Sequence, residues 1–283
     1  MDGARGSGDG TDAPILLKSP LALRIVSALV MAPVAIAAVW FGGLSLVVLT
    51  SAAAAIMGWE WARLCRGEVL RDGGAGVIGI VCGIILIAVL GGIGAAMAVA
   101  PIGALAVFAM ARGAQVREAP WLAIGTLWIA LPCILFLWLA GRAEGRELLL
   151  WMLAIVWVTD IGAYAAGRTL GGPRLAPRWS PRKTWAGLIG GILCAGLAGW
   201  VAARLLGLPS ALPLVLVSAG LAIIGQFGDL AESMAKRRFG VKDTSGLIPG
   251  HGGLLDRLDG LLAVIPAVAL LTVIGGGSVL SWR

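Results

Sequence analysis

The sequence predicts an all-α integral membrane protein with about nine transmembrane helices. Of its 283 residues, 59% are hydrophobic and only 13% are charged, and the mean hydropathy is +0.95. Soluble domains carry roughly 25% charged residues. The apolar residues also fall in runs close to the length of about 20 residues that a helix needs to cross a bilayer. A soluble helical bundle is disfavoured, because so much apolar sequence leaves too little polar surface to cover it.

The first element is a polar tail. Residues 1–19 are polar, glycine-rich and acidic, and they lack the basic segment and apolar core of a signal peptide. We expect them to form a disordered cytoplasmic tail, so that the first span carries the targeting signal.

Nine apolar segments follow the tail. Tryptophans near several of their ends are typical of side chains at a membrane interface. The fourth segment is the weakest prediction, because Gly92 and Gly94 leave only a very tight turn before it. The predicted spans are 22–42, 44–62, 74–91, 93–111, 121–141, 148–168, 184–206, 211–229 and 261–279.

Basic residues in the loops indicate the orientation of the chain. Arginine and lysine gather in the loops after even-numbered spans, whereas the other loops are poor in basic residues or balanced by glutamates. The positive-inside rule therefore predicts a cytoplasmic N-terminus and, with nine spans, a C-terminus on the opposite side. Basic cytoplasmic loops also account for the net charge of +7, so we expect no nucleic-acid partner.

Polar chemistry is concentrated in the second half of the chain. Residues 160–260 hold six of the fifteen acidic residues, eleven of the twenty-two basic residues and the single histidine. We therefore expect a transmembrane bundle over 20–145 that serves as a scaffold or contacts lipid. A catalytic region is expected over 146–283, with cytoplasmic loops at 169–183 and 234–257. No internal repeat is obvious, so a transporter built from inverted halves gains no support.

A carboxylate lies inside the sixth span. Asp160, Tyr164 and Arg168 are spaced four residues apart and share one helix face. A carboxylate at membrane depth is costly unless it is paired or lies in a wet cavity. Asp160 is therefore either half of a buried ion pair or part of a site.

The loop after this span is basic and precedes a helix. Ser180 or Thr184 suits a helix N-cap. Arg182 and Lys183 beside free backbone N–H groups would make an anion site, or they would anchor the loop to anionic lipid headgroups.

The eighth span ends in a polar face. Asp229, Glu232, Ser233 and Lys236 recur at helical spacing directly after an apolar run. Acids at this depth need partners, and the alternatives are an ion-paired helix face or contact with a metal or substrate.

The segment KDTSGLIPGHGGLLDRLDG, residues 242–260, follows. Its glycines let backbone N–H groups approach an anion. Asp256 and Asp259 lie in the first turns of the last span, as caps or as ligands. Together with Asp229 they would supply the carboxylates that Mg²⁺ needs. His251 is too solitary for zinc, and would bind a phosphate, shuttle a proton or be a plain loop residue. The chemistry suits phosphoryl or nucleotidyl transfer on a lipid.

The run from Ser233 to Asp259 resembles the signature of the phosphatidate cytidylyltransferase (CDP-diacylglycerol synthase) family. The segments DIGAYAAGR, SPRKTWAGLIGG and GDLAES are similar to further family motifs, whereas Ala186 and Ala235 depart from the family pattern. The matching positions of the signature are Ser233, Lys236, Arg237, Lys242, Asp243, His251, Gly252, Gly253, Asp256, Arg257 and Asp259.

The resemblance implies that CTP and phosphatidic acid react to give CDP-diacylglycerol and pyrophosphate. It implies a homodimer in the inner (plasma) membrane with its site facing the cytoplasm, and Mg²⁺, with a monovalent cation such as K⁺, at Asp229 and Asp256. The residues expected to be catalytic are Asp229, Lys236, Lys242, Asp243, His251 and Asp256. Those expected to bind substrate are Asp160, Tyr164, Ser180, Lys183, Thr184, Ser233, Arg237, Gly252, Gly253, Arg257 and Asp259.

Two other functions compete with this one. CDP-alcohol phosphotransferases also use several spans and clustered aspartates, but their last two aspartates are four residues apart, whereas Asp256 and Asp259 are three apart. An ion or solute transporter would use Asp160 and Asp229 as coupling carboxylates. The glycine-rich loop and the basic cluster argue against a transporter.

Overall fold

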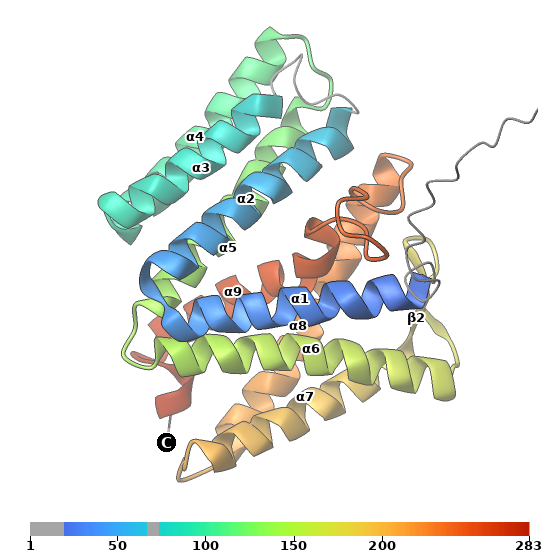
Figure 1. Ribbon diagram of the computed structural model, residues 1–283. Coiled ribbons are helices and arrows are strands. Elements are labelled where there is room, and N and C mark those ends of the chain that lie inside the picture. The colour runs from blue at the N-terminus through green and yellow to red at the C-terminus, as the bar shows by residue number, and fades with distance from the viewer. Residues whose placement is uncertain (1–19, 67–73, 283) are drawn as a thin grey trace, which may run out of the picture.

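The computed structural model describes residues 20–66 and 74–282. Within them the chain forms nine α-helices, as the apolar runs predict, and one short β-hairpin (Figure 1). Seven helices are long and apolar enough to cross a membrane; α1 and α3 contain the shorter apolar stretches Val26–Phe41 and Ala75–Leu90. The predicted tail, 1–19, lies outside the described residues. The elements are α1 (Pro20–Phe41), α2 (Gly43–Arg66), α3 (Gly74–Leu90), α4 (Ile93–Gly113), α5 (Ala119–Ala140), α6 (Gly145–Thr169), β1 (Arg174–Ala176), β2 (Ser180–Thr184), α7 (Trp185–Leu205), α8 (Leu212–Arg238) and α9 (Leu255–Ile274).

The ends of α8 and α9 differ from the prediction. α8 continues nine residues beyond the expected end at 229, and α9 begins six residues before the expected start at 261. The apolar run does end near Asp229, but the helix continues because Glu232 and Lys236, one turn apart, neutralise each other. The connection between the helices is therefore 239–254, which is shorter than the predicted loop 234–257. Part of the other predicted loop, 169–183, forms the β-hairpin.

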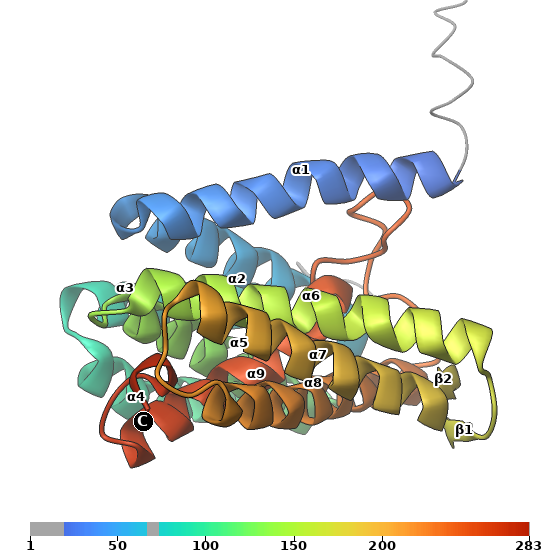
Figure 2. The same cartoon turned by 90° about the horizontal axis from the view of Figure 1, so that it is seen from below.

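α1 and α2 diverge from a very tight turn. Gly42 and Gly43 both have positive φ angles, 60° and 52°, which residues with side chains rarely adopt. The two helices open from this turn like the arms of a V (Figure 1). Seen from below, α1 lies along one edge of the bundle (Figure 2).

Glycines bring the helices of the second half close together. A Cβ atom at Gly162 of α6 would lie 3.0 Å from the carbonyl oxygen of Gly190 of α7. A Cβ atom at Gly228 of α8 would lie 2.8 Å from the carbonyl oxygen of Asp259 of α9. Small residues at such crossings are typical of membrane helices. The second contact sets Asp229 beside the first turns of α9.

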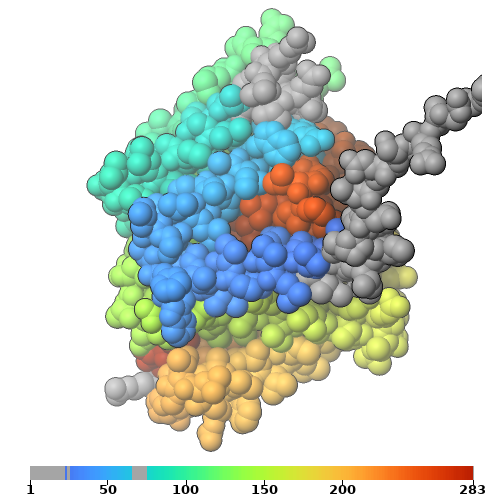
Figure 3. Space-filling model, in the orientation of Figure 1, coloured from blue at the N-terminus to red at the C-terminus, as the bar shows by residue number. Residues whose placement is uncertain are grey.

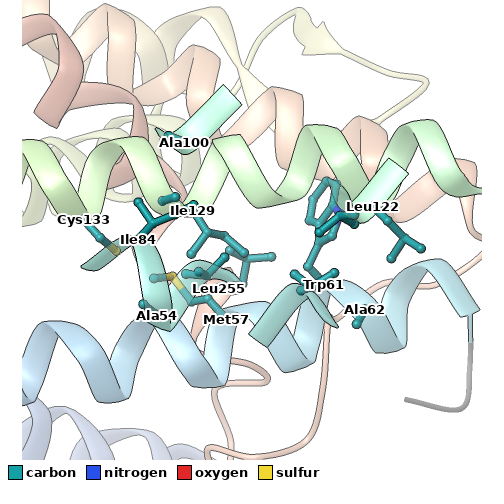
Figure 4. Close-up of a cluster of buried hydrophobic side chains, with 14 of the residues drawn as sticks. Ala54, Met57, Trp61, Ala62, Ile84, Ala100, Leu122, Ile129, Cys133 and Leu255 are labelled. Atoms are coloured by element: carbon teal, nitrogen blue, oxygen red, sulfur yellow. The ribbon is translucent and has the colours of Figure 1, made fainter. Parts of the chain in front are cut away.

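The hydrophobic core consists of two clusters, and each draws on both halves of the chain. The first cluster is formed mainly by side chains of α2, α3, α4 and α5. It also includes Leu255 of α9, which is fully buried (Figure 4). The second joins Ala38 and Val39 of α1 to α6–α9. The two predicted regions, 20–145 and 146–283, therefore share their cores. Their separate roles, as a scaffold or lipid-contacting bundle and as a catalytic region, stay a prediction.

Candidate active site

Polar residues of the second half converge where α8 ends and α9 begins. The 239–254 loop, drawn in orange, lies between α2 and α1 (Figures 1 and 2). The β-hairpin lies against α8, because Lys183 Nζ donates to the Gln226 carbonyl oxygen at 3.4 Å and Arg237 Nε donates to the Trp179 carbonyl oxygen at 3.3 Å. The structure thus brings together the two polar segments that the sequence singled out.

Lys236 is the ionic link between α8 and α9. Its Nζ lies 2.5 Å from Asp256 Oδ1 and 3.0 Å from Glu232 Oε2. The side chains of Lys236, Glu232 and Asp256 are 11%, 0% and 2% exposed. A buried ammonium is costly unless it is paired and hydrogen-bonded. The predicted catalytic Lys236 is therefore engaged by two carboxylates.

The second oxygen of Asp256 holds the 239–254 loop, which is called the active-site loop below. Asp256 Oδ2 accepts hydrogen bonds from Thr244 N and Thr244 Oγ1, each at 2.9 Å, and from Gly253 N at 2.8 Å. With Lys236 on Oδ1, four donors reach a carboxylate that offers about four lone-pair sites. Position 252 requires glycine, since its φ is +91° and a Cβ atom there would lie 3.0 Å from Oδ2. A metal ion at Asp256 would have to displace one of these donors.

Glu60 of α2 is a site residue that the sequence analysis did not identify. Its side chain is fully buried; Oε1 accepts from Ser245 Oγ at 2.6 Å and Leu254 N at 2.8 Å, and Oε2 accepts from Leu255 N at 2.7 Å. The first N–H groups of a helix lack partners within it, and the helix dipole favours a carboxylate there. An acid inside an apolar span was the available signal, but it does not reveal its partner.

Asp229 connects α8 to the hairpin. Its Oδ2 lies 2.6 Å from Lys183 Nζ, and Ser233 Oγ donates to its Oδ1 at 3.3 Å. About a third of the Asp229 side chain is exposed. Of the two aspartates predicted to hold a metal, Asp229 is therefore the more accessible.

Further acids surround Asp229. Asp160 of α6 interacts electrostatically with Asp229, Lys183 and Arg257. Asp259 of α9 interacts with Asp229 and Glu232. The side chains of Glu232 and Asp259 interact, and the buried Glu232 Oε1 has no hydrogen-bond partner within the described part of the chain. Two facing carboxyl groups must share a proton or a cation.

The site therefore contains more acids than bases. Five carboxylates, on Asp160, Asp229, Glu232, Asp256 and Asp259, meet three basic side chains, on Lys183, Lys236 and Arg257. In residues 20–66 and 74–282, no group of three His, Cys, Asp or Glu residues is arranged to hold a metal ion. Mg²⁺ needs only one or two carboxylates when water and phosphate complete its shell. The excess of carboxylates and the accessible Asp229 fit such a cation. Asp256 does not fit it, because its two oxygens already accept hydrogen bonds from four donors.

His251 lies at the side of the loop that faces α1. Its Nδ1 is 2.5 Å from Ser27 Oγ, and Ser27 Oγ also lies 3.4 Å from the Pro249 carbonyl oxygen. The loop between α8 and α9 is thereby joined to α1. The sequence alone gave no partner for this histidine.

The other predicted residues lie around these groups. Thr184 is the N-cap of α7 and accepts from Gly187 N at 3.0 Å, which confirms one of the two expected caps. Tyr164 is exposed and accepts from Arg168 Nη1 at 3.1 Å. Ser180, the other expected cap, begins β2 instead. The side chains left exposed for an anionic ligand are Arg237, Lys242 and Arg257, with Asp243 beside them.

Comparison with known proteins shows the family of the chain. The family model described as "Cytidylyltransferase family" matches residues 22–274. A protein of Brucella suis named phosphatidate cytidylyltransferase is 37% identical over 265 residues, which cover 91% of this chain and 94% of the relative. A protein of the same name from Rickettsia bellii is 41% identical over 52% of this chain and 66% of the relative. Another, from Staphylococcus epidermidis, is 45% identical over 47% of this chain and 51% of the relative. The resemblance carried by the run from Ser233 to Asp259 is confirmed: this chain belongs to the cytidylyltransferase family.

Proposed function

We propose that this chain transfers the cytidylyl group of CTP to phosphatidic acid, which yields CDP-diacylglycerol and pyrophosphate. The observation that carries the proposal is the match, over 91% of the chain, to a relative named phosphatidate cytidylyltransferase. The multi-pass helical bundle gives the enzyme access to a lipid substrate. The charged residues at one end of α8 and α9 supply a site for phosphate groups.

The proposed reaction is a direct displacement. A phosphate oxygen of phosphatidic acid attacks the α-phosphorus of CTP, the new P–O bond forms, and the bond to pyrophosphate breaks. Phosphatidic acid is already anionic at neutral pH, so the site needs no strong general base. Exposed Arg237, Lys242 and Arg257 bind phosphate oxygens. The predicted binding glycines, Gly252 and Gly253, support them indirectly, because their N–H groups donate to the Ile248 carbonyl oxygen and to Asp256 and so hold the loop in place. Lys183 keeps Asp229 in place.

We propose Mg²⁺ as the cofactor, with Asp229 as its principal protein ligand. A divalent cation bound there would neutralise the triphosphate and the charge that develops in the transition state. The acids around Asp229 support the proposal, because without a cation they repel one another. A monovalent cation such as K⁺ would neutralise the remaining charge. Asp256 contributes by holding Lys236 and the loop, and would join the metal only by exchanging one of these partners.

The proposal also covers the membrane in which the protein resides, the side that its site faces and its oligomeric state. The chain is a multi-pass membrane protein by its helices and family. We propose that it resides in the inner (plasma) membrane, that the 239–254 loop faces the cytoplasm where CTP is available, and that the enzyme is a homodimer. The basic residues of the hairpin and of the end of α8 support this orientation.

The test is an assay of the purified protein with radiolabelled CTP and phosphatidic acid. We expect CDP-diacylglycerol and pyrophosphate in equal amounts, loss of turnover with a chelator and recovery with Mg²⁺. Asp229→Asn should lower kcat by at least about a hundredfold. The matched control is Glu147→Gln, an exposed acid at the start of α6, which should behave as wild type. A wild-type protein that releases no pyrophosphate from CTP contradicts the proposed reaction, and turnover without Mg²⁺ contradicts the cofactor.

A further inference from the structure

An apolar cavity of about 370 Å³ lies between α1, α2, α5 and α9. Twenty residues line it, and Thr50 is the only polar residue among them. Its volume falls within the range of ligand pockets, roughly 300–1,000 Å³, whereas protein interiors contain few voids larger than a water molecule. Water would find almost no hydrogen-bond partners in such a cavity. The cavity therefore suits an apolar occupant.

The cavity and the candidate active site share a wall. Leu247 and Ile248 of the 239–254 loop line the cavity, and the same loop contributes Thr244 and Gly253 to Asp256. On α9, the lining residue Leu258 lies between Asp256 and Asp259 in sequence. An occupant of the cavity would thus end at the 239–254 loop, which carries the exposed Lys242 and precedes the exposed Arg257 of α9.

The shape of the cavity matches one acyl chain. Its lining runs from Leu254, the N-cap of α9, to Ile265 on that helix, eleven residues apart, or about 16 Å at 1.5 Å per residue. This length is close to half of the roughly 30 Å hydrocarbon core, the depth that one lipid chain covers in its own leaflet. The outer wall is α1, which meets the loop at Ser27 and His251. Space-filling atoms of the loop lie between those of α1 and α2 (Figure 3).

We propose that this cavity binds one acyl chain of the phosphatidic acid substrate and thereby sets the chain-length preference of the enzyme. The inference rests on the proposed function. The lipid phosphate lies at the 239–254 loop, and the chain runs along α9 between the two arms of the α1–α2 V. A long chain that fills the cavity makes contacts along its whole length, whereas a short chain leaves part of the lining without contacts, so long chains are the preferred substrates.

The first test narrows the cavity from the α1 side. Ala35 lines the cavity, whereas Ala37 lies on an exposed part of the same helix. For Ala35→Phe we expect the ratio of kcat/KM for dioleoyl to dihexanoyl phosphatidic acid to fall by about tenfold or more. Ala37→Phe should keep the wild-type ratio.

Ala53→Phe narrows the cavity from α2 and should reproduce the effect. An unchanged ratio in both cavity variants overturns the inference, while absence of any CTP turnover in the wild type overturns the proposed function instead.

A second test does not depend on turnover. Wild-type protein in phosphatidylcholine vesicles is irradiated with phosphatidic acid that carries a diazirine at the end of one chain. We expect labelled peptides from α1, α2 or α9 that contain cavity residues, and suppression of the label by excess unlabelled phosphatidic acid. Labelling elsewhere overturns the inference, and so does equal suppression by added phosphatidylcholine, which would show a general lipid site.

Discussion

Two buried carboxylates, far apart in sequence, hold the backbone of the active-site loop. Asp256 accepts hydrogen bonds from Thr244 and Gly253, and Glu60 accepts from Ser245 and the first N–H groups of α9. The two carboxylates thus hold both ends of the segment from Thr244 to Leu254. The position of the loop therefore depends on Glu60 of α2, which precedes its partner Ser245 by 185 residues.

Replacing Glu60 by glutamine tests this anchor. The amide presents an NH₂ group to donors that need acceptors, and hydrogen bonds to a charged acceptor are lost. We expect a loss of about 2–3 kcal/mol in stability, measured as the free energy of unfolding in detergent. Glu147→Gln, at an exposed position, is the matched control and should leave stability unchanged. A Glu60→Gln protein as stable as wild type would show that the contact contributes little.

Lys236→Met leaves two buried carboxylates without their shared cation. Breaking a buried ion pair by removing one partner costs about 3–5 kcal/mol, so we expect a loss of this size in the free energy of unfolding. Adding Glu232→Gln to Lys236→Met should recover part of it, since one uncompensated charge is then absent. Arg204→Met, at an exposed site in the last turn of α7, should change stability by no more than about 0.5 kcal/mol. Equal stabilities for wild type and Lys236→Met would contradict the ionic link.

At the scale of elements, glycine contacts set how closely α8 and α9 approach. Gly228→Ala places a methyl group 2.6 Å from the Ala263 Cβ atom and 2.8 Å from the Asp259 carbonyl oxygen, so the helices must separate. We expect kcat to fall by about tenfold or more, because small displacements of reacting groups are costly. Gly220→Ala is the matched control on α8, with nothing within 4 Å of its added methyl group, and should retain activity. Full activity of Gly228→Ala would show that the site tolerates a wider spacing.

The elements themselves could largely be predicted, but several of their ends could not. Apolar runs identify all nine helices, and helical spacing places Asp229, Glu232, Ser233 and Lys236 on one face of α8. Hydropathy fails at the end of α8, because the pairing of Glu232 with Lys236 lets a charged segment remain helical. The β-hairpin was missed, since its strands of three and five residues show no clear alternation of polar and apolar positions.

At the scale of the whole molecule, the site is assembled from both halves of the chain. The motif residues were identified from the sequence, but their partners were not. Lys183 with Asp229, Glu60 with Leu255, and Ser27 with His251 are separated by 46, 195 and 224 residues. Such contacts depend on how the helices pack, which local periodicity does not encode. The saturation of Asp256 is likewise a property of the folded loop.

The proposed orientation can be tested on the intact protein. In a variant without the four native cysteines, single cysteines replace exposed Arg178 in the hairpin region or exposed Ser210 between α7 and α8. We expect a membrane-impermeant maleimide to label Ser210→Cys in intact spheroplasts, and Arg178→Cys only after lysis. The reverse pattern would place the active-site loop outside the cytoplasm.

The contact between Glu60 and α9 also orders the events of biosynthesis. Glu60 precedes its partner Leu255 by 195 residues. At a synthesis rate of roughly 5–20 residues per second, about 10–40 seconds pass before the first turn of α9 has been made. During this interval the carboxylate lacks the donors that finally surround it, and an unpaired carboxylate is costly in an apolar medium. α2 therefore reaches its final environment only after α9 has been inserted, and until then the 239–254 loop lacks the anchor that Glu60 provides.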